Sequence, residues 1–113
     1  MKLLDLRRER ANRITEYDSL GAWSVMGSKG EGEARVYTLY FEPGGRIGRH
    51  RAGPAQLLLA VAGSGWVEGG DGVRKEIRTG EAALIESGEA HAKGSDSGMT
   101  AVMIQVENLE AAS

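Results

Sequence analysis

Short apolar runs alternate with glycine-rich turns along most of the chain. Turn signals lie at 27–32, 43–45, 69–72, 79–80, 87–88 and 94–98. The runs between them are rich in β-branched, aromatic and aliphatic residues, a pattern typical of an all-β sandwich or barrel. The pattern predicts strands near 22–26, 34–42, 46–50, 55–61, 64–69, 73–77, 82–85, 90–93 and 99–107.

The clearest predicted hairpin joins 64–69 to 73–77. The Gly70-Asp71-Gly72 segment between these strands can take the positive φ values that a tight turn needs. The first 20 residues leave two interpretations open. Their leucines at 3, 4 and 6 can begin a strand, whereas 6–13 can form a short helical turn.

The last predicted strand, 99–107, has apolar side chains on both faces. Val102 and Ile104 fall on one face, and Ala101 and Met103 fall on the other. Both faces are expected to be partly buried, as happens where a sheet closes or packs against a partner chain. A core of this size also gains from association, so we expect a homodimer.

The composition fits one globular domain spanning 1–113, with 41% hydrophobic and 27% charged residues. The net charge of −2 and the lack of a basic strip with interleaved aromatic residues argue against nucleic-acid binding. No apolar stretch approaches the ~18 residues that a membrane span needs. The absence of cysteine excludes disulfides and thiolate ligands. We therefore expect a cytoplasmic protein without nucleic-acid or membrane partners.

The chain contains two histidines, His50 and His91, and each follows a glycine turn. The intervals around them resemble the two motifs of the cupin superfamily. The first motif is glycine, five residues, His-x-His, three or four residues, glutamate, six residues, glycine. The second is glycine, five residues, Pro-x-Gly, two residues, histidine, three residues, asparagine. Every interval matches over 44–95, and the matching identities are Gly44, His50, Gly63, Gly80, Gly88 and His91.

Four motif positions differ from the superfamily pattern. Ala52, Gln56, Glu86 and Ser95 stand in place of the second histidine, the glutamate, the proline and the asparagine. The resemblance is to the small single-domain bacterial cupins, and it implies an all-β fold, a small antiparallel jelly-roll barrel.

In cupins, three histidines and one glutamate point into the barrel and hold one divalent metal. The resemblance therefore implies a reduced ligand set of His50, Gln56 and His91, which lacks one imidazole and the carboxylate. Such a site should hold Zn, Ni, Mn, Fe or Cu more weakly than the full set does. The alternative is a metal-free cluster in which Gln56, which both donates and accepts, hydrogen-bonds to the two imidazoles.

Two functions from different classes follow from the resemblance. The first is a non-catalytic cupin that binds a small-molecule ligand or a divalent metal ion. The second is a metal-dependent enzyme, a dioxygenase, isomerase or lyase acting on a small polar substrate.

Apolar and charged residues near the predicted site complete the picture. The candidates to line an apolar mouth around the histidines are Trp23, Met26, Tyr37, Tyr40 and Met103, with plain core packing as the alternative. Glu86, Glu89 and Lys93 are expected to be solvated, since charged residues in loops and on alternating positions usually are.

Overall fold

The chain folds into two antiparallel sheets that share one long strand. The computed structural model describes residues 1–112. Its strands are β1 (Lys2–Asp5), β2 (Asn12–Arg13), β3 (Trp23–Ser24), β4 (Ser28–Phe41), β5 (Arg46–Arg51), β6 (Ala55–Glu68), β7 (Arg74–Arg78), β8 (Glu81–Ile85), β9 (Ala90–Gly94) and β10 (Met99–Ala111). A single turn of 3-10 helix, η1 (Arg8–Arg10), follows β1. The predicted all-β fold is confirmed.

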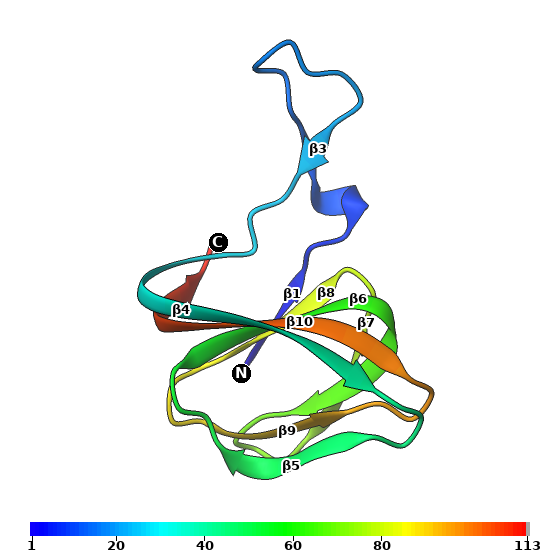
Figure 1. The fold of residues 1–113 in the computed structure, drawn as a ribbon, viewed down its shortest axis with the longest axis vertical. Coiled ribbons are helices and arrows are strands. Elements are labelled where there is room, and N and C mark those ends of the chain that lie inside the picture. The colour runs from blue at the N-terminus through cyan, green and yellow to red at the C-terminus, as the bar shows by residue number, and fades with distance from the viewer. Residues whose placement is uncertain (113) are drawn as a thin grey trace.

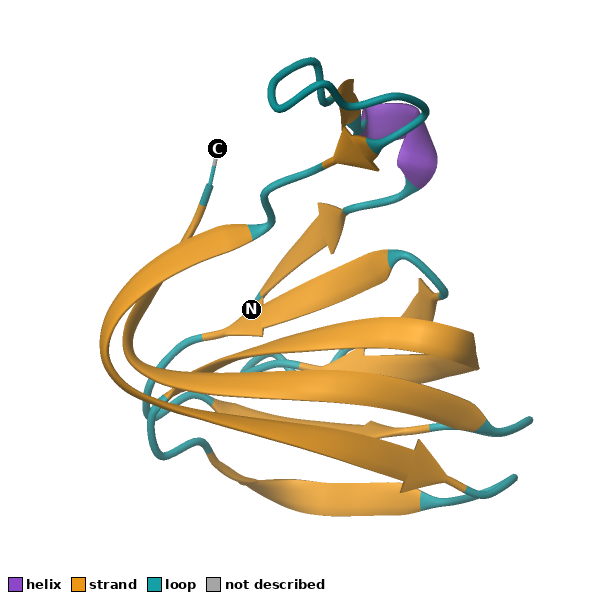
Figure 2. Cartoon of the chain, turned by 45° about the horizontal axis from the view of Figure 1, so that its top comes forward, coloured by secondary structure: helices purple, strands orange, loops and turns teal. Residues whose placement is uncertain are grey.

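Strand β6 belongs to both sheets and joins them. Its first part pairs with β8 and β10 in a sheet of order β1-β8-β6-β10-β4. Its second part pairs with β7 and β9, and β9 pairs in turn with β5. The strand changes sheets near Gly63, whose φ is +74°. The two sheets face each other across the interior (Figure 2).

Side-chain alternation along β6 separates an inner from an outer apolar face. Leu58 and Ala60 point inward into a buried cluster. The other buried members of this inner cluster are Phe41, Val67, Ile77, Ala83, Met99, Ala101 and Met103. Leu57 and Leu59 point outward and pack with Ile104 in a second cluster on the outside of the large sheet.

Strands β4, β6 and β10 are longer than the sequence predicts. Residues 27–32 were expected to form a turn, but most of them extend β4, because β10 continues to Ala111 and supplies partners for them. The strands expected at 55–61 and 64–69 form one strand, β6, since the chain bends at Gly63 without leaving the sheet. The predicted hairpin from 64–69 to 73–77 is confirmed as the β6–β7 pair.

The N-terminal segment contains both a strand and a short helical turn, the two interpretations that the sequence left open. Strand β1 pairs with β8 at the sheet edge, and η1 follows directly. Strands β2 and β3 then form a small separate hairpin that projects away from the barrel, on the side opposite β5 and β9 (Figure 1). Among residues 1–112, no helix has the length and apolar character to cross a membrane.

Candidate functional site

The two histidines meet on neighbouring strands. His50 on β5 lies directly opposite His91 on β9 in the strand register. Their ring centroids are 4.5 Å apart and the ring planes are inclined by 58°. His91 is fully buried, whereas His50 is exposed, so the pair joins the interior of the barrel to solvent.

Backbone carbonyls fix the orientation of both imidazoles. Nδ1 of His50 donates to the carbonyl oxygen of Gly48 at 2.8 Å, and Nδ1 of His91 donates to that of Glu89 at 3.2 Å. Because a carbonyl oxygen can only accept, the proton of each neutral ring sits on Nδ1. The Nε2 atom of each neutral ring therefore carries the lone pair.

Lys93 belongs to this cluster, although the sequence did not predict it. It was expected to be solvated, but only 2% of it is exposed. Its Nζ donates to Oε1 of Gln56 at 2.6 Å and lies 3.4 Å from Nε2 of His91. Nζ also lies 3.6 Å from Sδ of Met103. Lys93 follows His91 by two positions on β9, and strand alternation therefore turns both side chains into the barrel.

Burial sets the charge states of this cluster. Removal from water lowers the pKa of Lys93 to about 8, so its amine still carries a proton at neutral pH. Burial is also the main cause that lowers the pKa of His91, and the charges of Lys93 and His50 lower it further. A neutral imidazole therefore sits beside an ammonium group at neutral pH.

The arrangement of these residues does not fit a resident divalent metal. His50 and His91 are close enough to share an ion, but Oε1 of Gln56 is already bonded to the ammonium of Lys93. No group of three or more His, Cys, Asp or Glu side chains within residues 1–112 is arranged to hold a metal. A +2 ion placed here would lie beside a buried +1 charge, and no carboxylate would offset the repulsion.

Met103 joins the cluster, but the other predicted lining residues do not. Trp23 lies on the projecting hairpin, where the guanidinium groups of Arg8 and Arg13 lie over its ring at 4.0 and 4.7 Å. Met26 and Tyr40 are 69% and 78% exposed, and Tyr37 is also exposed. Trp23, Met26, Tyr37 and Tyr40 therefore do not form the expected apolar mouth around the histidines.

Of the two acidic residues near His91, Glu86 is exposed as expected, and Glu89 is not. The carboxylate of Glu89 accepts hydrogen bonds from the backbone N–H groups of Glu86 and Gly70. It also lies 2.6 Å from the amine of Met1. These donors together favour the charged form and lower its pKa, although burial opposes them. Glu89 thus connects the backbone at Glu86 and Gly70 with the amine of Met1, beside the site.

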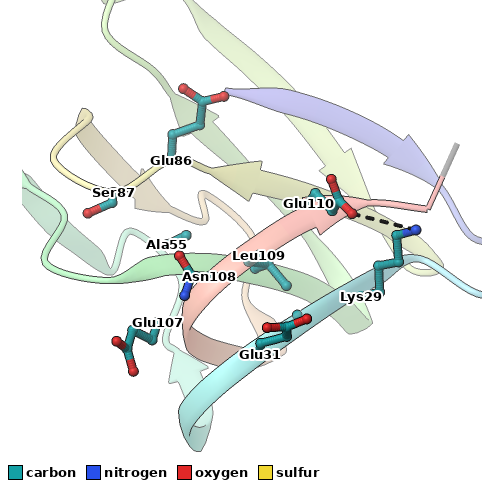
Figure 3. Close-up of a pocket in the computed structure, with 10 residues that line it drawn as sticks. Lys29, Glu31, Ala55, Glu86, Ser87, Glu107, Asn108, Leu109 and Glu110 are labelled. Carbon is teal, nitrogen blue, oxygen red and sulfur yellow. Dashed lines mark ion pairs between the residues drawn. The ribbon is translucent and has the colours of Figure 1, made fainter.

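A hollow of about 620 Å³ lies elsewhere, between the start of β4, the end of β10 and the loop after β8 (Figure 3). Four glutamates line it: Glu31, Glu86, Glu107 and Glu110. Lys29 pairs with Glu110 across its edge at 3.5 Å. No residue of the histidine cluster lines this hollow, so the hollow and the histidine site are separate.

Comparison with known proteins identifies the architecture. No family model matches the chain. A cupin superfamily protein from Desulfitobacterium hafniense superposes with a TM-score of 0.61 at 13% identity, over 94% of this chain and 98% of that one. A cupin-like protein from Thermotoga maritima gives a TM-score of 0.62 at 21% identity, over 69% of this chain and 63% of that one. The chain has the cupin fold.

One curated protein resembles the sequence of this cupin barrel. An (R)-mandelonitrile lyase from Granulicella tundricola is 36% identical to it over 67 residues. The match covers 58% of this chain and 51% of the lyase, so the chain spans about half the length of that relative.

Proposed function

We propose that the cupin barrel binds a small organic anion, such as a carboxylate, without a metal. The observation that carries this proposal is the buried ammonium of Lys93. It has three N–H donors, and only Gln56 lies at a short distance from it. The contacts to His91 and Met103 are long, so an anionic oxygen can replace them with a stronger charge-assisted hydrogen bond.

The charge around His50 supports an anionic ligand. Strand β5 carries three exposed arginines, Arg46, Arg49 and Arg51, next to the exposed ring of His50. Arg49 and Arg51 donate to the backbone carbonyls of neighbouring turns, which are neutral. The positive charge of these arginines therefore persists and attracts anions towards the site.

A thermal-shift panel of small carboxylates, with acetate and benzoate among the probes, tests the proposal. Binding to the folded state raises the melting temperature, and the stabilisation grows with the logarithm of ligand concentration over Kd once the ligand is in excess. We expect a stabilising carboxylate for the parent protein and for Lys75→Leu, which removes an exposed lysine of β7. Lys93→Leu should lose at least about tenfold in affinity, because a charge-assisted hydrogen bond is removed. Equal carboxylate affinity of Lys93→Leu and the parent protein would contradict the proposal.

A second candidate is a lyase that cleaves a small hydroxynitrile, favoured by the resemblance to (R)-mandelonitrile lyase. Neutral His91 offers a lone pair on Nε2 to take the proton of the substrate hydroxyl. The carbon–carbon bond to the nitrile then breaks and leaves an aldehyde. The ammonium of Lys93 stabilises the departing cyanide.

The ultraviolet absorbance of benzaldehyde reports this cleavage directly. With mandelonitrile as substrate, we expect turnover by the parent protein and by Lys75→Leu. His91→Gln should lose at least about a hundredfold in rate, the usual contribution of a general base. The lyase candidate is rejected if mandelonitrile reacts no faster than in buffer.

A further inference from the structure

The two imidazoles are oriented as metal ligands are. Ligating histidines in proteins usually donate their second ring N–H to a backbone carbonyl or a carboxylate, which fixes the tautomer. His50 and His91 both do so, through Gly48 and Glu89. Their rings lie on adjacent strands with centroids 4.5 Å apart. This leaves two Nε2 lone pairs for a cation.

The third donor already holds a cation. Oε1 of Gln56 accepts from Nζ of Lys93 at 2.6 Å, and Nζ reaches to 3.4 Å from Nε2 of His91. Both Gln56 and Lys93 are only 2% exposed, so the contact is closed to bulk water. We infer that the ammonium of Lys93 is a built-in substitute for a divalent metal and closes a latent metal site made by His50, Gln56 and His91.

The chemistry of the donors explains why a single positive charge suits the site. None of the three donors carries a negative charge, and no glutamate occupies position 56 to offset a charge of +2. A buried charge is tolerated only when hydrogen bonds replace its hydration. The ammonium donates such bonds to Gln56 and His91 and brings half the charge of a divalent ion.

Metal uptake at this site does not require the proposed ligand. Metal uptake is measured without any small organic molecule, whereas anion binding is measured without metal. The two experiments can therefore fail separately.

Removal of Lys93 should open the latent site. Lys93→Leu supplies no ligand atom and no charge, and we expect it to bind about one equivalent of Co²⁺ or Zn²⁺ in equilibrium dialysis. The visible absorption of Co²⁺ should report nitrogen coordination, and a second substitution, His91→Gln, should abolish it. The parent protein and the matched variant Lys75→Leu should each retain less than about a tenth of an equivalent. Circular dichroism establishes that Lys93→Leu is folded.

The substitution Gln56→Glu distinguishes a resident ammonium from an ordinary weak metal site. If Lys93 holds the site, the new carboxylate pairs with the ammonium, and metal uptake stays at the level of the parent protein. Only Gln56→Glu combined with Lys93→Leu should bind metal, at least about tenfold more tightly than Lys93→Leu alone. One equivalent of metal in the parent protein or in Gln56→Glu would overturn the inference. So would a folded Lys93→Leu that takes up none.

Discussion

Nζ of Lys93 and Oε1 of Gln56 form a 2.6 Å hydrogen bond in the interior of the barrel, between strands β9 and β6. Both side chains are almost completely withdrawn from solvent. Every buried side-chain nitrogen and oxygen within residues 1–112 has a hydrogen-bond partner. The pair therefore satisfies a buried charge, and its two members depend on each other.

Breaking this pair on one side should cost more than replacing both sides. Gln56→Leu leaves the ammonium without its short acceptor, and we expect a loss of about 3 kcal/mol in the free energy of unfolding. Gln56→Leu combined with Lys93→Leu removes the uncompensated charge and should recover most of that loss. Urea denaturation of the parent protein, both single variants and the double variant measures this cycle. Additive effects would contradict a direct coupling of the two side chains.

The stability of the protein should rise in mildly alkaline solution. The pKa of Lys93 is lowered from 10.5 to about 8 by burial. Between these values the folded protein releases a proton that the unfolded chain retains, so the free energy of unfolding increases with pH. A shift of this size corresponds to about 3 kcal/mol once pH exceeds the unfolded value. Urea denaturation at about pH 7 and about pH 10 should show most of this gain in the parent protein and none of it in Lys93→Leu.

The strand pattern and the motif intervals predicted most of the fold. The spacing of glycine turns predicted the strands, and the two motifs predicted that His50 and His91 share one site. In the structure His50 lies opposite His91, although the two are far apart in sequence. Local pattern did not predict that 27–32 extends β4, since a glycine-rich segment becomes a strand only when a partner is available. That partner is the end of β10, where Ser28 pairs with Ala111.

The parts of the site that the sequence did not predict depend on closure of the barrel. Lysine is almost always solvated, so Lys93 was expected outside, although its position two residues after His91 assigned it to the same face. Trp23 and Tyr40 are apolar enough for a pocket, but Trp23 lies on a hairpin outside the barrel and Tyr40 is exposed on β4. Hydropathy ranks residue types, and it does not say which face of an edge strand is inside.

Gly63 should be intolerant of any side chain. Its φ of +74° favours glycine, and a Cβ at this position would collide with the carbonyl oxygen of Gly98. We expect Gly63→Ala to lower the free energy of unfolding by about 2 kcal/mol or more. Gly70→Ala is the matched control, because no atom lies within 4 Å of its added Cβ, and it should change stability by less than about 0.5 kcal/mol. Thermal denaturation that ranks the two variants equally would contradict the geometric argument.

The outer face of the large sheet should join two copies of the chain. Val36 on β4, Ile104 on β10 and Leu57 on β6 are direct neighbours in the register and therefore share that face. Val36 is 67% exposed at the edge of the sheet, next to the outer apolar cluster. Light scattering after size exclusion should give twice the 12.0 kDa of one chain. Val36→Lys should give a single chain, because dimerisation would bury its charge. Val73→Lys, an exposed position beside the β6–β7 turn, should remain dimeric, and a parent protein of 12.0 kDa would disprove the association.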